Sequence, residues 1–307
     1  MCQFKSGIIL KDRVFIPDYD SHTDMLEKLK IEDTEENAKR LFVRAELIPP
    51  NDDVFAPVSS WEYHIDQDIL PEWYVAEVDE RRMRDAVTEW AKEHIHIGEK
   101  IEEITSGLHW IMDGTVGTIG GSAKVENIYG SAEVKYICDS AEVGNIYGFA
   151  KVRNICGSAK VGEIYDSANI ENICGSANIG NIYDSAEVGD ICGSAKVGDI
   201  CGSANIGNIY DSAKVGDICG SANIGNIYDS AEVGDICGSA NIENIYGSAN
   251  IGNIYDSAAA TIPELMKWEH TKSVCIKDNA VLIDRYNKKI YHSGAFETVI
   301  AGGEENE

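Results

Sequence analysis

Basic residues are scarce in this chain of 307 residues, which has 26 lysines and arginines against 52 aspartates and glutamates. The formal net charge is −26, and the deficit is shared along the chain. Residues 1–109 have 13 basic and 25 acidic residues, and residues 110–262 have 7 and 19. Direct binding of nucleic acid needs a basic face for the phosphates, so we expect none. The same negative field favours a basic protein partner, or a protein that itself binds DNA or RNA.

Long hydrophobic runs are also missing. The N-terminus, "MCQFKSGIILKDRVF", has only the short apolar run Gly7–Leu10, so we expect no signal peptide, and no later stretch is long enough to cross a membrane. Nine cysteines without a sign of secretion predict reduced thiols and a cytoplasmic location. The cysteines form no CxxC pair and have no histidine nearby, which favours small packed hydrophobes over metal ligands. No cofactor is expected.

One nine-residue pattern, in contrast, fills the middle of the chain. The stretch "GDICGSANIGNIYDSAEV", Gly216–Val233, contains two copies, and sixteen copies run without insertion from Ile119 to Ile262. A weaker copy begins at Trp110. The consensus is Ile, Tyr or Cys, Gly or Asp, Ser, Ala, a polar residue, Val or Ile, Gly, and Asn or Asp. A fixed period of this kind indicates a repeat architecture.

The residue types of the repeat indicate strands. In "SANI" and "SAEV" the Ala and the Val or Ile are two positions apart, so both face one side of an extended segment. Nine residues are too few for a helix with its loops, and β-branched residues dominate the apolar positions. We predict a short strand in each repeat and a corner at the Gly-Asn or Gly-Asp pair before the next Ile. The sequence therefore predicts an all-β parallel β-solenoid over residues 110–262, with Ala, Val and Ile inside.

The position after each Ile predicts the size of a coil. Tyr and Cys alternate there, which favours two repeats, or eighteen residues, per coil; alternation left over from duplication of a two-repeat unit is the other explanation. Eighteen residues per coil would stack the tyrosines in two ladders on opposite edges. The first ladder comprises Tyr129, Tyr147, Tyr165 and Tyr183, and the second comprises Tyr210, Tyr228 and Tyr246.

Two segments without repeats flank the solenoid. Residues 1–109 predict an α+β head domain, with a helix that begins after Ser21 as a possible N-cap. Residues 263–307 predict an α/β cap, with a helix in "IPELMKWEHTK" and a hairpin around Asn287-Lys288. A cap covers strand edges that would otherwise pair end to end. The alternative role of this segment is a homodimer contact.

Several known families resemble parts of the chain. The Ala-x-apolar pair of the repeat resembles pentapeptide-repeat proteins, some of which are acidic DNA mimics, although their period of five is absent. The short Gly-Ile-Val patterning resembles bactofilin-like solenoids, which lack a bulky head and a cap. The segment from Trp61 to Tyr74 and the helix after it resemble a head domain of uncharacterised phage and gut-bacterial proteins, which implies no activity. Calcium-binding nonapeptide rolls and threonine-rich ice-binding solenoids differ from this repeat in their ligand and threonine positions.

The head holds two candidate sites. His64, Asp66 and Asp68 in "HIDQD" would share one strand face, as a metal-binding edge or as a solvated surface; His94 and His96 in "HIHIG" repeat this geometry.

Cys2, exposed by removal of Met1, resembles the nucleophile of N-terminal-nucleophile hydrolases, whose chain amine serves as the base. The Arg and Asn-rich signatures of those enzymes are not found downstream.

The solenoid edges are the third candidate, because a carboxylate directly follows four of the ladder tyrosines. These pairs predict a non-enzymatic interaction protein that presents phenols and regularly spaced charge to a basic partner, in the form of a phage-type inhibitor or a nucleic-acid mimic. A self-assembling rod or filament, and a hydrolase that uses Cys2, are the alternatives. The predicted binding residues are Tyr165, Asp166, Tyr183, Asp184, Tyr210, Asp211, Tyr228 and Asp229.

Overall fold

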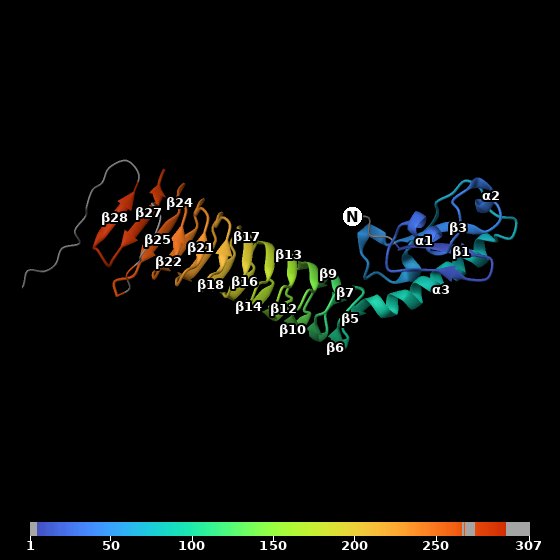
Figure 1. Cartoon of the computed structure of the whole chain (residues 1–307), viewed down its shortest axis with the longest axis horizontal. Helices are drawn as coiled ribbons and strands as arrows, with labels where there is room; N and C mark the ends of the chain where they lie inside the picture. The colour runs from blue at the N-terminus through green and yellow to red at the C-terminus, as the bar shows by residue number, and fades with distance from the viewer. Residues whose placement is uncertain (1–4, 266, 268–273, 293–307) are drawn as a thin grey trace, which may run out of the picture. The chain divides into compact units, whose positions relative to one another are not determined.

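The structure, a computed structural model, describes residues 5–265, 267 and 274–292 in two compact units (Figure 1). The head unit is Met1–Ile97 with Gly107–Trp110, and the solenoid unit is Gly98–Ser106 with Ile111–Glu307. Within the described residues, no helix is both long and apolar enough to cross a bilayer.

The head unit is an α+β fold, as predicted. Its antiparallel sheet has the order β2-β1-β3-β4 and is accompanied by three helices and two short 3-10 turns. Ser21 caps the first helix, because its side chain accepts a hydrogen bond from the Asp24 N–H at 3.2 Å. The elements are β1 Lys5–Leu10, β2 Val14–Phe15, α1 His22–Lys28, α2 Glu35–Ala38, β3 Phe42–Ile48, η1 Pro50–Asp52, η2 Val58–Ser60, β4 Glu62–Ile65 and α3 Ala76–His94.

The two faces of this sheet bury separate cores. Alternation along β1 sends Ile9 to the side of α3, where it joins Met83 and Val87. Its neighbour Ile8 packs on the opposite side with Met25 and Leu26 of α1. The sheet therefore holds a helix on each face, and it fixes where the first residue of α1 lies.

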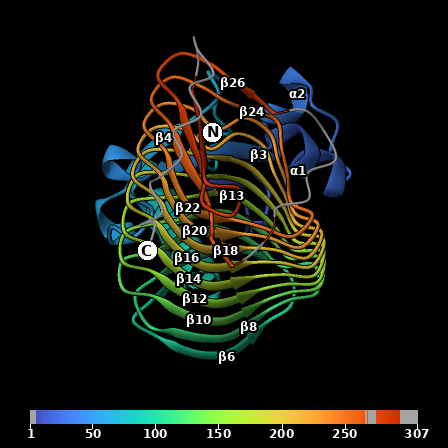
Figure 2. The same ribbon diagram turned by 90° about the vertical axis from the view of Figure 1, so that its left-hand side faces the viewer.

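The repeats form a parallel β-solenoid, as predicted, and Figure 2 shows the even-numbered strands stacked one above the next. The ten-stranded sheet comprises β5 Ile95–Ile97, β7 Leu108–Met112, β9 Lys124–Tyr129, β11 Glu142–Ile146, β13 Lys160–Ile164, β15 Asn178–Ile182, β17 Lys196–Ile200, β19 Lys214–Val215, β21 Glu232–Val233 and β23 Asn250–Ile251. The twelve-stranded sheet comprises β6 Lys100–Ile104, β8 Thr115–Ile119, β10 Glu133–Ile137, β12 Lys151–Ile155, β14 Asn169–Ile173, β16 Glu187–Ile191, β18 Asn205–Ile209, β20 Asn223–Ile227, β22 Asn241–Ile245, β25 Ala259–Ile262, β27 Val281–Asp284 and β28 Lys289–His292.

Each coil contains two repeats, so the prediction of eighteen residues per coil is confirmed. Strand β13 pairs with β15 so that Val161 lies opposite Ile179 and Ile164 opposite Ile182. The Ala, Val or Ile, and Ile positions of the repeats all lie in one continuous core. Neighbouring coils stack apolar side chains from equivalent positions of the repeat, and burial of this surface is the main favourable term in folding.

The corner of the repeat lies elsewhere than predicted. Most of the Gly-Asn and Gly-Asp pairs lie inside strands, as Gly144-Asn145 does in β11, and a Cβ on Gly144 would approach the Glu126 carbonyl oxygen to 2.5 Å. The chain turns instead at the Gly or Asp that follows Tyr or Cys, as at Gly148 with φ 72° and Asp166 with φ 55°. The left-handed region favours Gly and tolerates Asp, which explains why only these two residues alternate at that position.

The C-terminal end of the solenoid carries the predicted hairpin. Strand β27 continues the parallel sheet next to β25, and β28 folds back antiparallel against β27. On the other sheet, β26 (Cys275–Ile276) pairs with β24 (Asn253–Ile254). The predicted helix in Ile262–Lys272 lies mostly outside the described residues, and its described start, Pro263–Leu265, is a turn.

One pair of cysteines departs from the expectation of reduced thiols. Cys219 and Cys237 form a disulfide, with Cα atoms 4.7 Å apart, so that expectation is wrong for this pair. The coil spacing permits this bond, because residues eighteen apart on one edge stand at a separation that a disulfide can span. Cys138, Cys156, Cys174, Cys192 and Cys201 are free thiols on the same two edges.

Candidate functional site: the tyrosine and aspartate edges of the solenoid

The tyrosines of both ladders stack ring on ring, as the eighteen-residue coil predicts. Ring centroids in the first ladder lie 4.6 Å apart between Tyr129 and Tyr147, and 5.1 Å apart between Tyr165 and Tyr183. In the second ladder, Tyr210 and Tyr228 are 5.0 Å apart and nearly parallel. Offset stacking at these distances is favourable, so each ladder is a continuous aromatic strip along one edge.

The pKa values of Tyr165 and Tyr183 in the first ladder are raised, which favours their neutral phenols. Burial is the largest cause that raises the pKa of Tyr183, and its hydroxyl donates a hydrogen bond to Glu163 Oε2 at 2.7 Å. Burial and the nearby Asp166, Glu163 and Asp184 carboxylates raise the pKa of Tyr165. A neutral phenol beside ionised carboxylates gives each edge an aromatic surface with negative charge at its rim.

The predicted carboxylates lie in the turns, one per coil, and are exposed. Asp166 and Asp184 follow each other on the first edge, and Asp211 and Asp229 follow each other on the second. The Gly148 N–H donates to Asp166 Oδ2 at 3.2 Å, across one coil. The structure thus brings the eight predicted residues together as two Tyr-Asp clusters, one on each edge, rather than as a single site.

We expect the solenoid to keep its fold without calcium. The Gly193 N–H donates to Asp211 Oδ2 at 3.0 Å, and such bonds together with solvent offset the repulsion of stacked exposed carboxylates, about 0.2–1 kcal/mol per pair. Addition of a chelator should leave the far-UV circular dichroism and melting temperature of the solenoid unchanged. A large loss of β signal on chelation would contradict this.

An exposed phenylalanine that the sequence analysis missed borders the first cluster. Phe149 is 70% exposed, although a ring of this size is normally buried. Together with Tyr129, Asp166 and Asp184, it lines a hollow of about 460 Å³. The signal was present in the sequence, because "GFA" at 148–150 replaces the "GSA" or "DSA" of the other repeats.

A larger hollow of about 610 Å³ lies on the twelve-stranded sheet, and its charges are mixed. Among the residues that line it, Lys151 pairs with Glu133 at 3.9 Å and Arg153 pairs with Glu171 at 3.2 Å. Exposed pairs of this kind are worth little and largely cancel each other's field. The edges are therefore better placed than this sheet to attract a basic partner.

The histidine and cysteine candidates of the head are separated. His64 lies exposed in β4, whereas Asp66 and Asp68 follow the strand, and Asp66 turns to His22 instead. His94 stacks on Trp90, and its Nε2 lies 2.9 Å from Asp18 Oδ1, in an aromatic cluster. Cys2 lies outside the described residues.

The chain matches no protein-family model, and no curated protein and no solved structure is detectably similar to it.

Proposed function

We propose that this protein is a non-enzymatic interaction protein whose solenoid edges bind a basic protein partner. The observation that carries the proposal is the hollow on the first edge, where Asp166 and Asp184 stand beside Tyr129 and the exposed Phe149. Aromatic faces next to carboxylates suit the guanidinium group of arginine, through cation–π contact and charge-assisted hydrogen bonds.

The spacing of the edges supports a nucleic-acid mimic that acts as an inhibitor or decoy. On each edge, two successive coils place a carboxylate beside a ring, at an interval of about 4.8 Å. A protein that grips nucleic acid meets regularly spaced negative charge next to stacked aromatic faces, and both edges offer this combination. Two resemblances also favour this proposal: that of the repeat to pentapeptide-repeat proteins, some of which mimic DNA, and that of the head to phage proteins.

The test measures binding of an arginine-rich peptide, and of the same peptide with citrulline in place of arginine, to the full chain. Replacement of Asp166, Asp184, Asp211 and Asp229 by Asn should lower the affinity for the arginine peptide about tenfold, or ~1.4 kcal/mol, because each exposed charge contributes a few tenths of a kcal/mol. Asn also tolerates the left-handed turn, so the fold should persist. Binding should weaken with salt and should be lost with citrulline.

A matched variant separates the edges from the net charge. Replacement of Glu133, Glu187, Glu232 and Glu243 by Gln removes the same four charges from exposed strand positions and should change binding little. Phe149→Ser restores the consensus and should weaken binding at the first edge only. Affinity that is indifferent to the four Asn changes and to salt would refute the proposal.

A further inference from the structure

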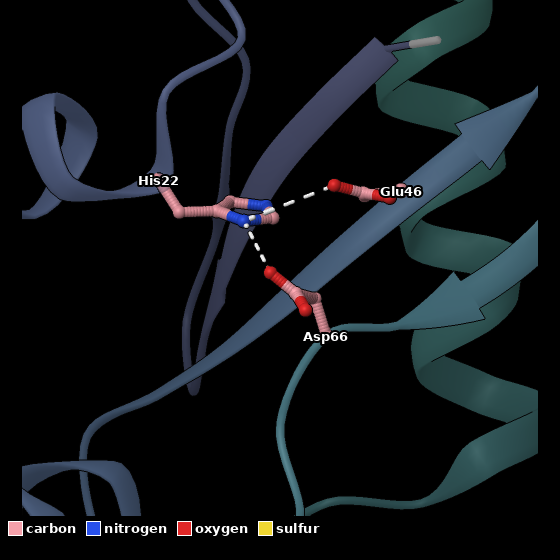
Figure 3. A group of neighbouring side chains, drawn as sticks. All are labelled: His22, Glu46 and Asp66. Carbon is pink, nitrogen blue, oxygen red and sulfur yellow. Dashed lines mark hydrogen bonds and ion pairs between the residues drawn. The ribbon is translucent and has the colours of Figure 1, made fainter. Parts of the chain in front are cut away.

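Three potential metal ligands from separate segments of the head unit converge on one point (Figure 3). His22 is the first residue of α1, Glu46 lies in β3, and Asp66 directly follows β4. His22 Nδ1 is 3.1 Å from Asp66 Oδ2 and 4.0 Å from Glu46 Oε1. One ligand atom from each residue lies within 4.8 Å of the other two. Among the described residues, no other group of three histidine, cysteine or carboxylate side chains brings its ligand atoms this close together.

The Nε2 atom of His22 faces a backbone carbonyl oxygen, which can accept a hydrogen bond from a neutral ring. His22 Nε2 lies 3.4 Å from the Ala45 carbonyl oxygen, which can only accept a hydrogen bond. With the proton on Nε2, the lone pair of Nδ1 is directed at the two carboxylates and can bind a metal ion; with the proton on Nδ1, the ring donates to Asp66 Oδ2 instead. This arrangement of a backbone carbonyl behind the ring is the one that orients histidine ligands in metal sites.

With the proton of His22 on Nε2, three acceptors face one another, two of them on largely buried side chains. The side chains of His22 and Glu46 are 9% and 15% exposed, whereas that of Asp66 is 58% exposed. A second proton on Nδ1 would serve Asp66 at 3.1 Å but would not reach Glu46 at 4.0 Å. Within the described part of the chain, no donor makes a hydrogen bond to the Glu46 carboxylate. A divalent cation would satisfy all three groups at once and would offset the burial of the Glu46 carboxylate.

The distances fit a small metal ion with little rearrangement. Tetrahedral ligands at about 2.0–2.1 Å from zinc stand about 3.3–3.4 Å from one another. The observed distances from His22 Nδ1, 3.1 Å to Asp66 and 4.0 Å to Glu46, bracket this separation. A rotation of either carboxylate side chain would bring its oxygen to the separation that zinc ligands have. One imidazole and two carboxylates suit Zn²⁺ and Mn²⁺, whereas Ca²⁺ and Mg²⁺ prefer oxygen ligands alone.

We infer that His22, Glu46 and Asp66 form a binding site for one divalent transition-metal ion, with a coordination position open to solvent beside Asp66. The ion joins the start of α1 to β3 and β4. The site is independent of the solenoid edges and of the function proposed for them.

Titration of the full, metal-free chain with Zn²⁺ and with Mn²⁺ tests the inference, by calorimetry and by the melting temperature of the head. Mn²⁺ is included because it disfavours the thiolates of the solenoid. We expect one saturable Mn²⁺ site per chain and a melting temperature that rises with metal concentration. His22→Asn, Glu46→Gln and Asp66→Asn should each lower the affinity at least tenfold.

The neighbouring residues supply the controls. Asp68→Asn removes a similar side chain from the same segment and should leave the affinity unchanged, whereas His64→Asn, opposite Glu46 in the strand pairing, should change it at most slightly. Asp66→Asn alters an exposed side chain, so it keeps the test valid if the two buried variants fail to fold. Absence of a saturable Mn²⁺ site would overturn the inference, as would Mn²⁺ affinity that is unchanged in Asp66→Asn or equally lost in the controls.

Discussion

Ala195→Glu is expected to unfold several coils of the solenoid and to lower the free energy of unfolding by about 4–5 kcal/mol. Ala195 is fully buried in the continuous core, between the backbones of neighbouring coils. A glutamate there adds volume to a packed interior and places a carboxylate within a cluster of buried hydrophobic side chains. Because each coil is stabilised by its neighbours, the defect should spread along the stack. Thermal unfolding followed by far-UV circular dichroism measures the effect.

Asn205→Glu is the matched control for this variant. Asn205 is exposed at the start of β18, and glutamate occupies the equivalent position at Glu187 and Glu232. It adds the same charge without burying it, so the melting temperature should stay within a few degrees of the parent. An unchanged melting temperature for Ala195→Glu would contradict the inward placement of the alanine row.

Alkaline pH is expected to destabilise the solenoid through its tyrosine ladders. The pKa of Tyr165, Tyr183 and Tyr228 is raised above the ordinary value of 10.0, chiefly by burial. For Tyr210 the hydrogen bond with Cys192 is the largest cause and burial the second. A phenol whose folded pKa exceeds the unfolded one favours the folded state fully below pH 10, and this contribution is lost as pH rises further.

Ultraviolet absorbance and circular dichroism, recorded together from pH 8 upward, measure this effect. Tyr165, Tyr183, Tyr210 and Tyr228 should ionise at higher pH than free tyrosine, and unfolding should accompany their ionisation. Tyr165→Phe with Tyr183→Phe keeps the stacked rings but removes two titrating groups, so the loss of structure should move to higher pH. Ionisation of every tyrosine near pH 10 without loss of fold would show that the ladders are solvated and energetically neutral.

Much of the solenoid could be predicted because a stack repeats its contacts at a constant offset in sequence. The alternation of Tyr and Cys pointed to eighteen residues, and the pairing of Val161 with Ile179 has that offset. The same offset places Tyr165 on Tyr147 and Asp184 after Asp166. The spacing of residue types along the sequence therefore also identifies which residues are neighbours in the structure.

The corner of the repeat was misplaced for a local reason. Gly-Asn and Gly-Asp are turn formers in general, and they were assigned the turn. In the stack, Gly144 of a Gly-Asn pair lies against the Glu126 carbonyl, and the left-handed residue is instead the Gly or Asp after Tyr or Cys. Which of two turn-forming positions bends depends on how closely the coils approach, and composition does not reveal that distance.

The sequence by itself determined the solenoid, its coil of two repeats, its buried Ala, Val and Ile rows and its aromatic and acidic edges, because regular spacing converts directly into stacking. Only the tertiary structure decided what happens where the spacing is irregular. His22, Glu46 and Asp66 meet because an antiparallel sheet and a helix start bring three unrelated segments together. Phe149, which replaces the serine of the other repeats, borders Asp166 and Asp184 because coil stacking places it next to the turns of the following coils. Contacts without a period depend on the path of the chain between them, which no local pattern encodes.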